Sequence, residues 1–440
     1  MPHDGKQASK LGHLTLNESP WVRHLIDGFE RAPADAGDHG GTPWTAFDPA
    51  AAAPLSRVWA VDGSFVEVRS NDTPPREVAF VKAALLWLDR DALADIDPHF
   101  PHPLDLRDVM ASSGLFHATA FPLRHVRTGL GDNYTAVRNI VRDSIQMDQN
   151  GDFYKTLKWL AYRRWAPTPT RSPDFQCPHP HCARDIADGL PPDADDGPCP
   201  HCRQEVFLTD MPGFHQSMGE DAAPLAVASD YMLVMETLML FTPVRLAWEG
   251  ADKKLVSDTL FLKDGPLTLR GQYSKLVEPI RAFLQHARTV GRPVHIVGQE
   301  KTGAFVDHLS GIARFAAPNE RGDPPSVAVL THGYVNREVQ RLPDRANNYG
   351  LKTNWGEKVY VKLDPATFMV LSVPPGLYDD RREAPLPADL IGLDRILATI
   401  PTLVSRRFGG GLYPIELANG IASLSSYPSA KILQRFLDSA

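Results

Sequence analysis

The sequence predicts a mixed α/β fold, in which a sheet flanked by helices carries a small inserted zinc-ribbon module. Three observations predict it. The first half of the chain contains an apolar strand pair, and the second half alternates short apolar strands with helical segments. The segment 166–210 is rich in Pro and Asp and holds all four cysteines. With 43% hydrophobic and 22% charged residues, the chain has enough apolar surface for a core, which excludes disorder throughout.

The first half supplies a helix, a linker, a strand pair and a helical region. Ser before Pro and Trp predicts a helix over 19–29, since Ser caps helices and Pro suits their first position. Small residues with Gly and Pro over 32–54 indicate a linker. The apolar runs at 58–68 and 77–87 predict a buried antiparallel pair. Apolar spacing over 128–165 favours helix.

The second half supplies the alternating elements. The predicted strands and helices are a helix at 225–242, a strand at 257–265, a helix at 272–290, a strand at 293–298, a helix at 302–314, a hairpin of 359–363 with 368–373, and helices at 388–405 and 428–438. We therefore divide the chain into an N-terminal helix and linker (1–57), the first part of a main domain (58–165), the cysteine module (166–210) and the remainder of the main domain (211–440).

Composition also bounds the location and the partners. The most apolar region, 232–248, is interrupted by Glu236, Pro243 and Arg245, so we expect no membrane span. The N-terminus lacks an apolar signal segment, so we expect a cytoplasmic protein. The net charge of −7 argues against a protein that coats nucleic acid. It leaves room for a nucleic-acid enzyme, because residues 124–171 contain nine Lys or Arg against four Asp.

The cysteines form two short pairs separated by a loop. The ligands we expect for one structural Zn²⁺ are Cys177, Cys182, Cys199 and Cys202. Four thiolates close the coordination shell, so this zinc is not expected to be catalytic. Three histidines between the cysteines could replace a thiolate ligand. Free reduced thiols and a redox motif are weaker alternatives, since the segment is polar and lacks a βαβ context.

Three acidic residues have the pattern of a site for a hard cation. Asp62 and Asp264 each end an apolar strand and precede a Gly, and Glu236 lies within a strongly apolar helical segment. Together they would repel one another without a cation, and carboxylates suit Mn²⁺ or Mg²⁺. Two such ions can promote phosphodiester hydrolysis. The alternatives are exposed turn aspartates and a buried ion pair of Glu236, for instance with Arg245.

The segments AVDGS (60–64), LKDGPL (262–267) and GLYPIELANGIASL (411–424) together resemble the NurA family of nucleases. This resemblance implies an RNase H-like core and a Mn²⁺-dependent DNA nuclease, with 5′-to-3′ exonuclease and single-strand endonuclease activity. It also implies a homodimer that works with a HerA-type hexameric ATPase translocase, in DNA-end processing or in defence against phage. The cysteine module is not a general feature of the family.

The resemblance assigns roles to particular residues. Asp62 and Asp264 match the metal-binding aspartates, and Glu236 best matches the acid on the intervening helix. Tyr413 matches the Tyr of a late Tyr-Pro motif. Asn419 lies near the position where the family usually has a His. Asn can bind phosphate or water through hydrogen bonds, but it cannot transfer a proton at neutral pH.

Lys301, after the strand at 293–298, could neutralise charge on a reacting phosphate, although an exposed loop lysine is the simpler interpretation. The basic residues expected to follow a DNA backbone are Arg138, Arg142, Lys155, Lys158, Arg163 and Arg164.

Two alternatives to a nuclease stay open at this point. One is a non-catalytic DNA-end clamp or adaptor, which the missing His favours. The other is an actin-like ATPase, which the lack of a second Gly-rich phosphate loop opposes.

Overall fold

The computed structural model describes residues 19–28, 44–89, 114–218, 225–251, 254–312, 325–342, 348–376, 384–405, 411–424 and 429–439. The chain divides into two compact units, Met1–Gly41 and Thr42–Ala440. The described part of the first unit is helix α2 (Pro20–Asp27), which is capped by the Ser19 side chain, as predicted. Of the linker predicted over 32–54, residues 32–43 lie outside the described residues.

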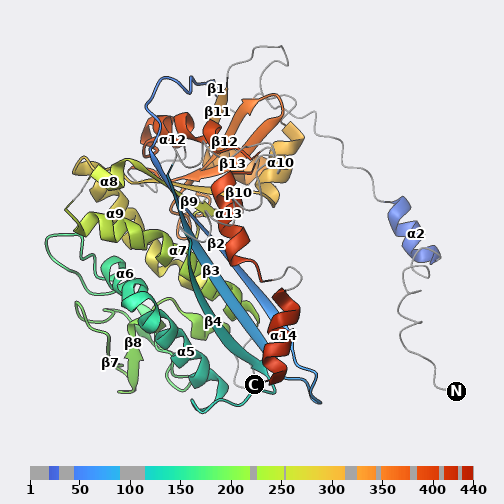
Figure 1. The fold of residues 1–440 in the computed structure, drawn as a ribbon, viewed down its shortest axis with the longest axis vertical. Helices are drawn as coiled ribbons and strands as arrows, with labels where there is room; N and C mark the ends of the chain where they lie inside the picture. The colour runs from blue at the N-terminus through green and yellow to red at the C-terminus, as the bar shows by residue number, and fades with distance from the viewer. Residues whose placement is uncertain are drawn as a thin grey trace. The chain divides into compact units, whose positions relative to one another are not determined.

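The second unit is built on a nine-stranded mixed sheet (Figure 1). Its strands in spatial order are β1 (Thr45–Ala46), β11 (Ser326–Val329), β12 (Glu357–Asp364), β13 (Thr367–Val373), β10 (His295–Glu300), β9 (Thr259–Asp264), β2 (Arg57–Arg69), β3 (Glu77–Asp89) and β4 (Gly114–Arg124). Strand β9 runs parallel to both of its neighbours, β2 and β10, and the other pairings are antiparallel. The predicted mixed α/β architecture is therefore confirmed.

The strand pair predicted at 58–68 and 77–87 is the β2–β3 hairpin. Its register is unbroken from Arg57 opposite Asp89 to Arg69 opposite Glu77. Side chains alternate along β2, so Val58 and Ala60 lie on one face of the sheet and Val61 lies on the other. Because both faces carry apolar side chains, both must pack against other elements. The predicted hairpin of 359–363 with 368–373 is likewise confirmed as β12 and β13.

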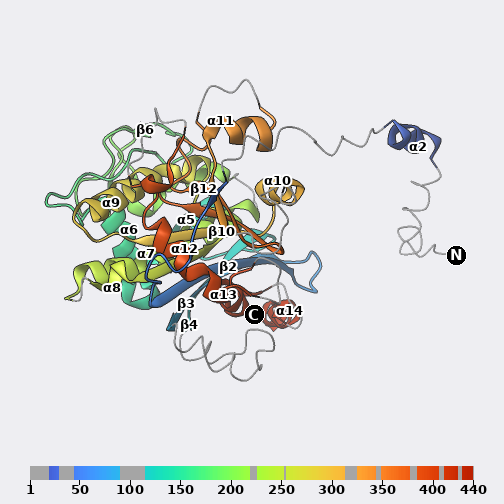
Figure 2. The ribbon, with the colours of Figure 1, turned by 90° about the horizontal axis from the view of Figure 1, so that it is seen from above.

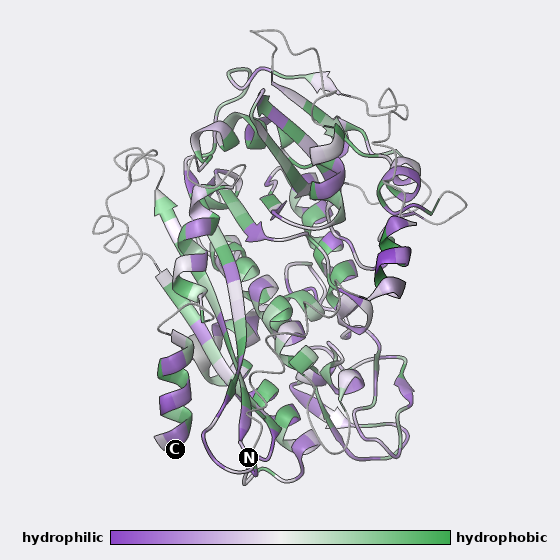
Figure 3. Cartoon of the chain, turned by 90° about the vertical axis from the view of Figure 1, so that its right-hand side faces the viewer, coloured by the Kyte–Doolittle hydropathy of each residue, from purple (hydrophilic) through white to green (hydrophobic). Residues whose placement is uncertain are grey.

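Helices cover both faces of the sheet (Figures 1 and 2). One face packs against α5 (Asn133–Met147), α6 (Asp152–Ala161), α7 (Leu225–Glu249) and α9 (Val277–Thr289), with α10 (Ala304–Ile312) over the β12–β13 end. The other face packs against α12 (Leu393–Thr399), α13 (Tyr413–Ala422) and α14 (Ser429–Ser439). Short helices α8 (Lys254–Ser257) and α11 (His332–Tyr334) lie in connections. Figure 3 shows hydrophobic residues concentrated along the strands between these layers.

Helix α7 is the central helix of the first face. It is long and apolar enough to cross a membrane by length and composition alone, but 67% of its apolar window is buried inside the protein. We expected the helix to end near 242, and this was wrong, because α7 continues through Pro243 to Glu249. Arg245 near its end donates to Asp152 and Glu249, so it is not the partner of Glu236. The buried position of α7 makes it part of the core.

The cysteine segment forms two small hairpins between α6 and α7. They are β5 (Phe175–Gln176) with β6 (Asp185–Ile186), and β7 (Asp196–Pro198) with β8 (Glu205–Phe207). Their apolar residues, including Phe175, Ile186 and Val206, belong to the same buried cluster as α7. The module is therefore continuous with the main core.

Phe283 of α9 packs against four other aromatic rings. The centroid of its ring lies 4.6 Å from that of Trp159 and 5.2 Å from that of Trp248. We expect Phe283→Ala to lower the free energy of unfolding by about 3–5 kcal/mol, because the side chain is fully buried and leaves a cavity. Chemical denaturation measures this change. Phe436→Ala on α14, where the ring is 61% exposed, is the matched control and should change stability little.

Candidate metal sites

Two aspartates lie side by side at the ends of neighbouring parallel strands. Strands β2 and β9 are in register up to Val61 opposite Lys263, so the next residues, Asp62 and Asp264, are neighbours on one face. Asp62 is only 5% exposed, and its Oδ1 accepts from the amide of Gly63 at 2.7 Å. Parallel pairing therefore brings together two carboxylates that are 202 positions apart in the chain.

Glu236 reaches these aspartates from α7, on the opposite face of the sheet. Its carboxylate is buried and accepts from Lys263 Nζ at 2.5 Å, and the same ammonium donates to the carbonyl of Asp264 at 2.8 Å. A Cβ at Gly63 would lie 2.6 Å from Glu236 Oε1 and 2.5 Å from Met232 Cγ. The missing side chain of Gly63 is therefore what lets α7 and Glu236 approach this part of β2.

Lys301 and Glu416 complete the polar cluster. Lys301 follows the end of β10, and its Nζ lies 3.4 Å from Asp264 Oδ1 and 2.9 Å from Glu416 Oε1. Glu416 is in the first turn of α13. The interpretation of Lys301 as an exposed loop residue is wrong, since only 27% of its side chain is exposed. We call Asp62, Glu236, Asp264, Lys263, Lys301 and Glu416 the carboxylate cluster.

The other two candidates from the sequence lie on α13 as well. Tyr413 begins this helix and stands one turn before Glu416, on the same side. Asn419 is exposed, and no hydrogen bond or ion pair with described residues joins its side chain to the carboxylate cluster. The sequence reasoning missed Glu416 and Lys263. The signal for Glu416 was present, because an acid three residues after Tyr413 shares its helix face.

The carboxylate cluster has more negative than positive charge. Burial, together with the nearby Asp264 and Glu236 carboxylates, raises the pKa of Asp62 to about 8, against the opposing effects of the Gly63 amide and Lys301. Burial also raises the pKa of Glu236, against the attraction of Lys263. Two lysines thus face four carboxylates, and a further cation would relieve the repulsion. Oxygen donors of this kind fit Mn²⁺ or Mg²⁺.

The carboxylate oxygens are not gathered as tightly as a metal shell requires. Across the described ranges, one group of three or more Cys, His, Asp or Glu side chains has all its donor atoms within 4.8 Å, and it consists of the four cysteines. In the carboxylate cluster, lysine ammonium groups hold Glu236 and Asp264 instead. Binding of a divalent cation there would require these two lysines to release their acids or to share them.

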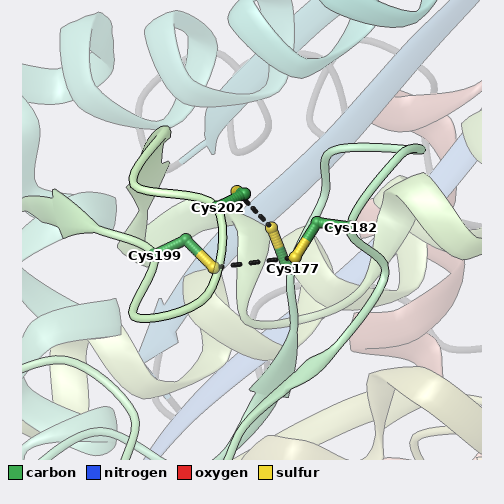
Figure 4. A group of neighbouring side chains, drawn as sticks. All are labelled: Cys177, Cys182, Cys199 and Cys202. Atoms are coloured by element: carbon green, nitrogen blue, oxygen red, sulfur yellow. Dashed lines mark hydrogen bonds between the residues drawn. The ribbon is translucent and has the colours of Figure 1, made fainter.

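The four cysteines converge on one point (Figure 4). The Sγ atoms of Cys177 and Cys202 are 3.8 Å apart, and those of Cys182 and Cys199 are 3.9 Å apart. Four sulfurs at about 2.3 Å from a central Zn²⁺ would be separated by about 3.8 Å, so the spacing fits a tetrahedral site. The cluster can therefore bind a metal such as zinc.

The hairpin backbones hold the cysteines in place. The amide of Cys177 donates to Arg184 O, and the amide of Cys199 donates to Gln204 O, each at 2.8 Å. Two histidines have other roles than metal binding, since His179 contacts Glu205 O at 2.8 Å and His201 contacts Asp185 O at 3.1 Å through their Nε2 atoms. The third, His181, is exposed. The four thiolates would therefore be the ligands of a bound metal.

The basic residues of 124–171 are largely neutralised. The six cations expected to follow DNA each form an ion pair: Arg138 with Asp210, Arg142 with Asp143, Lys155 with Asp152, Lys158 with Asp195, Arg163 with Glu278, and Arg164 with Asp193. Arg138 is mostly buried, so its role is structural. DNA binding by this stretch stays a prediction, with less free charge than the sequence indicated.

Comparison with protein-family models returned no match, and comparison with curated proteins likewise found no significant match. The interpretation of the two sites therefore depends on their residues and geometry.

We expect the protein, purified without chelator, to contain about one Zn²⁺ per chain, because the four thiolates form a closed shell. Cys199→Ser should lose the zinc and lower the melting temperature, since Cys199 is fully buried in a module that shares the main core. Elemental analysis and thermal denaturation measure both effects. His181→Ala, at an exposed side chain of the same module, should retain the metal, and a wild-type content well under half an equivalent would contradict the assignment.

Proposed function

We propose that this protein is a Mn²⁺- or Mg²⁺-dependent deoxyribonuclease that hydrolyses phosphodiester bonds at the carboxylate cluster. The observation that carries the proposal is the convergence of Asp62, Asp264 and Glu236, which come from two parallel strand ends and a core helix. Buried acids that repel one another cost stability, so their presence together needs a functional reason. A site for a divalent cation is such a reason.

The topology around the acids supports an RNase H-like interpretation of the core. The β2–β3–β4 strands form an antiparallel meander, and β9 adds to β2 in parallel. Acids on a central strand and on a nearby helix are the arrangement that the NurA resemblance implies. The same resemblance leads us to propose 5′-to-3′ exonuclease or single-strand endonuclease activity, a homodimer, and a HerA-type hexameric translocase as partner in the cytoplasm. DNA-end processing and phage defence are the proposed settings.

Each member of the carboxylate cluster has a proposed task. Asp62, Asp264 and Glu236 would hold the Mn²⁺ or Mg²⁺, whose chemistry is to activate water and to stabilise the leaving oxygen. Lys301 lies where its ammonium group can stabilise negative charge on the phosphate, and Glu416 orients it through the 2.9 Å ion pair. Lys263 acts against the rise that burial causes in the pKa of Glu236, and so favours the ionised form that a cation would bind.

One observation favours a second candidate, a non-catalytic DNA-end clamp or adaptor of the translocase. Lys263 and Lys301 already pair with Glu236 and Asp264, so two of the acids have a partner without a metal. Asn419 in place of a family His agrees with this candidate. Incubation of the purified protein with end-labelled single- and double-stranded DNA in Mn²⁺, Mg²⁺ or EDTA distinguishes the two, because a clamp binds ends without cutting.

Asp62→Asn and Asp264→Asn should each abolish Mn²⁺-dependent DNA cleavage, because Asn has a similar shape and lacks the charge that a hard cation requires. The fold and the zinc content should be retained. Without Mn²⁺, the melting temperature of Asp62→Asn should rise at neutral pH. Burial, Asp264 and Glu236 raise the pKa of Asp62 to about 8, so folding must protonate a group that is ionised in the unfolded chain, and Asn removes this cost. Nuclease assays and thermal denaturation measure these effects.

Two Asp-Gly pairs outside the carboxylate cluster provide matched controls. Asp27 and Asp188 are exposed, so Asp27→Asn and Asp188→Asn should leave cleavage unchanged. Wild-type cleavage rates in the Asp62 and Asp264 variants would show that the metal assignment is wrong.

Gly63→Ala should reduce cleavage strongly while retaining the zinc module. The added Cβ would displace Glu236 and Met232, which lie 2.6 Å and 2.5 Å from its position. Comparison of cleavage rate with melting temperature tests the claim. A variant that cuts at the wild-type rate would show that the position of Glu236 is not needed.

A further inference from the structure

A polar cavity of about 410 Å³ lies next to the carboxylate cluster. One wall begins at Pro266, two residues after Asp264, and another includes Glu300, the residue before Lys301. The cavity therefore opens at the end of the same parallel strands, β9 and β10, that present Asp264 and Lys301. Glu300 faces the α10 side of the sheet and Asp264 faces the α13 side, so a DNA strand bound at the carboxylate cluster would reach this cavity by crossing the ends of β9 and β10.

The cavity is preformed by backbone hydrogen bonds. Leu269 donates to Thr353 O and Trp355 donates to Leu267 O, each at 2.9 Å, so the wall containing Gly350 and Asn354 is fixed to the segment that follows β9. The Arg281 guanidinium supports this wall from below through the carbonyls of Leu351 and Asn354. Little ordering is therefore needed when a ligand enters.

The charge in the cavity is positive on balance. Lys358 is buried and forms an ion pair with Glu300, so these two charges compensate each other. The Lys358 ammonium group also donates to Ser372 Oγ at 3.1 Å. Arg270 at the rim is exposed and makes no ion pair with any described residue. Burial raises the pKa of Asp230, and the charge of Arg270 opposes this rise. Arg270 is the exposed cation of the lining that a phosphate group could reach.

The remaining lining groups suit a nucleobase. Tyr349 is half-buried, and its ring stands against Phe305 at 5.5 Å between centroids in a T-shaped pair, which leaves the orientation of the ring fixed. Aromatic rings in such positions stack on bases. Asn354 and Gln340 are also lining residues, and side-chain amides of this kind can form hydrogen bonds with a base edge. The Asn354 Oδ1 already accepts from Thr353 Oγ1 at 3.3 Å.

We propose that this cavity is a nucleotide subsite, in which Tyr349 stacks on one base of a DNA strand and Arg270 binds its phosphate. The inference rests on the proposed nuclease function for the identity of the strand, but the subsite itself needs no divalent cation. It would hold a nucleotide of the same strand on the other side of the ends of β9 and β10, and so help to set the position of cleavage.

Calorimetric titration of the zinc-containing protein with deoxyadenosine 5′-monophosphate, in buffer free of Mn²⁺ and Mg²⁺, tests the proposal. Tyr349→Ala should weaken binding roughly tenfold, because base stacking is lost, and should leave 2-deoxyribose 5-phosphate binding unchanged. Arg270→Gln should weaken both ligands. Arg292→Gln, at the opposite end of β10, and Phe116→Ala, at an exposed ring of β4, are the matched controls and should bind as the wild type does.

The outcomes separate this inference from the proposed function. Unchanged binding in the Tyr349 and Arg270 variants, or binding of inorganic phosphate as tight as that of the nucleotide, would overturn the subsite. A wild-type protein that cuts DNA in Mn²⁺ but binds no nucleotide would overturn the subsite and keep the nuclease. Nucleotide binding that the two variants weaken, in a protein that cuts no DNA, would support the subsite and reject the nuclease.

Discussion

The architecture depends on one buried ion pair, between Glu236 of α7 and Lys263 of β9. Each of these side chains is at most 4% exposed, and removing a charge of either sign from water costs several kcal/mol unless a partner compensates. The 2.5 Å contact supplies that partner, and the second bond from Lys263 to Asp264 O fixes the ammonium group at the end of β9. This pair therefore sets how α7 crosses the sheet, and with it the position of the strand ends.

The same pair explains the electrostatics of the carboxylate cluster. Lys263 compensates Glu236, and Lys301 is shared by Asp264 and Glu416, so Asp62 has no lysine of its own. This is why burial and two neighbouring acids can raise its pKa so far. A divalent cation that bound Asp62 would also attract Asp264 and Glu236, in competition with the lysines. The lysines would then become available for other negative charge, of which a phosphate is the proposed source.

Local sequence motifs were enough to predict those site residues whose positions depend on neighbouring residues in the chain. Asp62 and Asp264 each follow an apolar run and precede a Gly, and the spacing of the four cysteines by itself predicts their cluster. Glu236 stood out as a charge in an apolar run, and the alternative of a buried ion pair agrees with the structure. The partner is Lys263 and not the example Arg245, because Lys263 belongs to another element that the chain brings close only on folding. Strand β4, whose sequence has no regular polar and apolar alternation and contains a Pro, was missed, as was α13. Both are fixed by packing on β3 and β2, which sequence periodicity does not show.

The cysteine module is connected to the carboxylate cluster through the core. Arg138 of α5 donates to both carboxylate oxygens of Asp210 at 2.7 Å, and its guanidinium lies over the ring of Phe207 at the end of the module. The apolar residues of the module continue into the cluster that buries α7. A packed core has few voids, so a displacement at one place in it shifts the neighbouring side chains instead of being absorbed. Loss of the four-thiolate centre would therefore loosen the layer that holds α7, and Glu236 is placed by that helix.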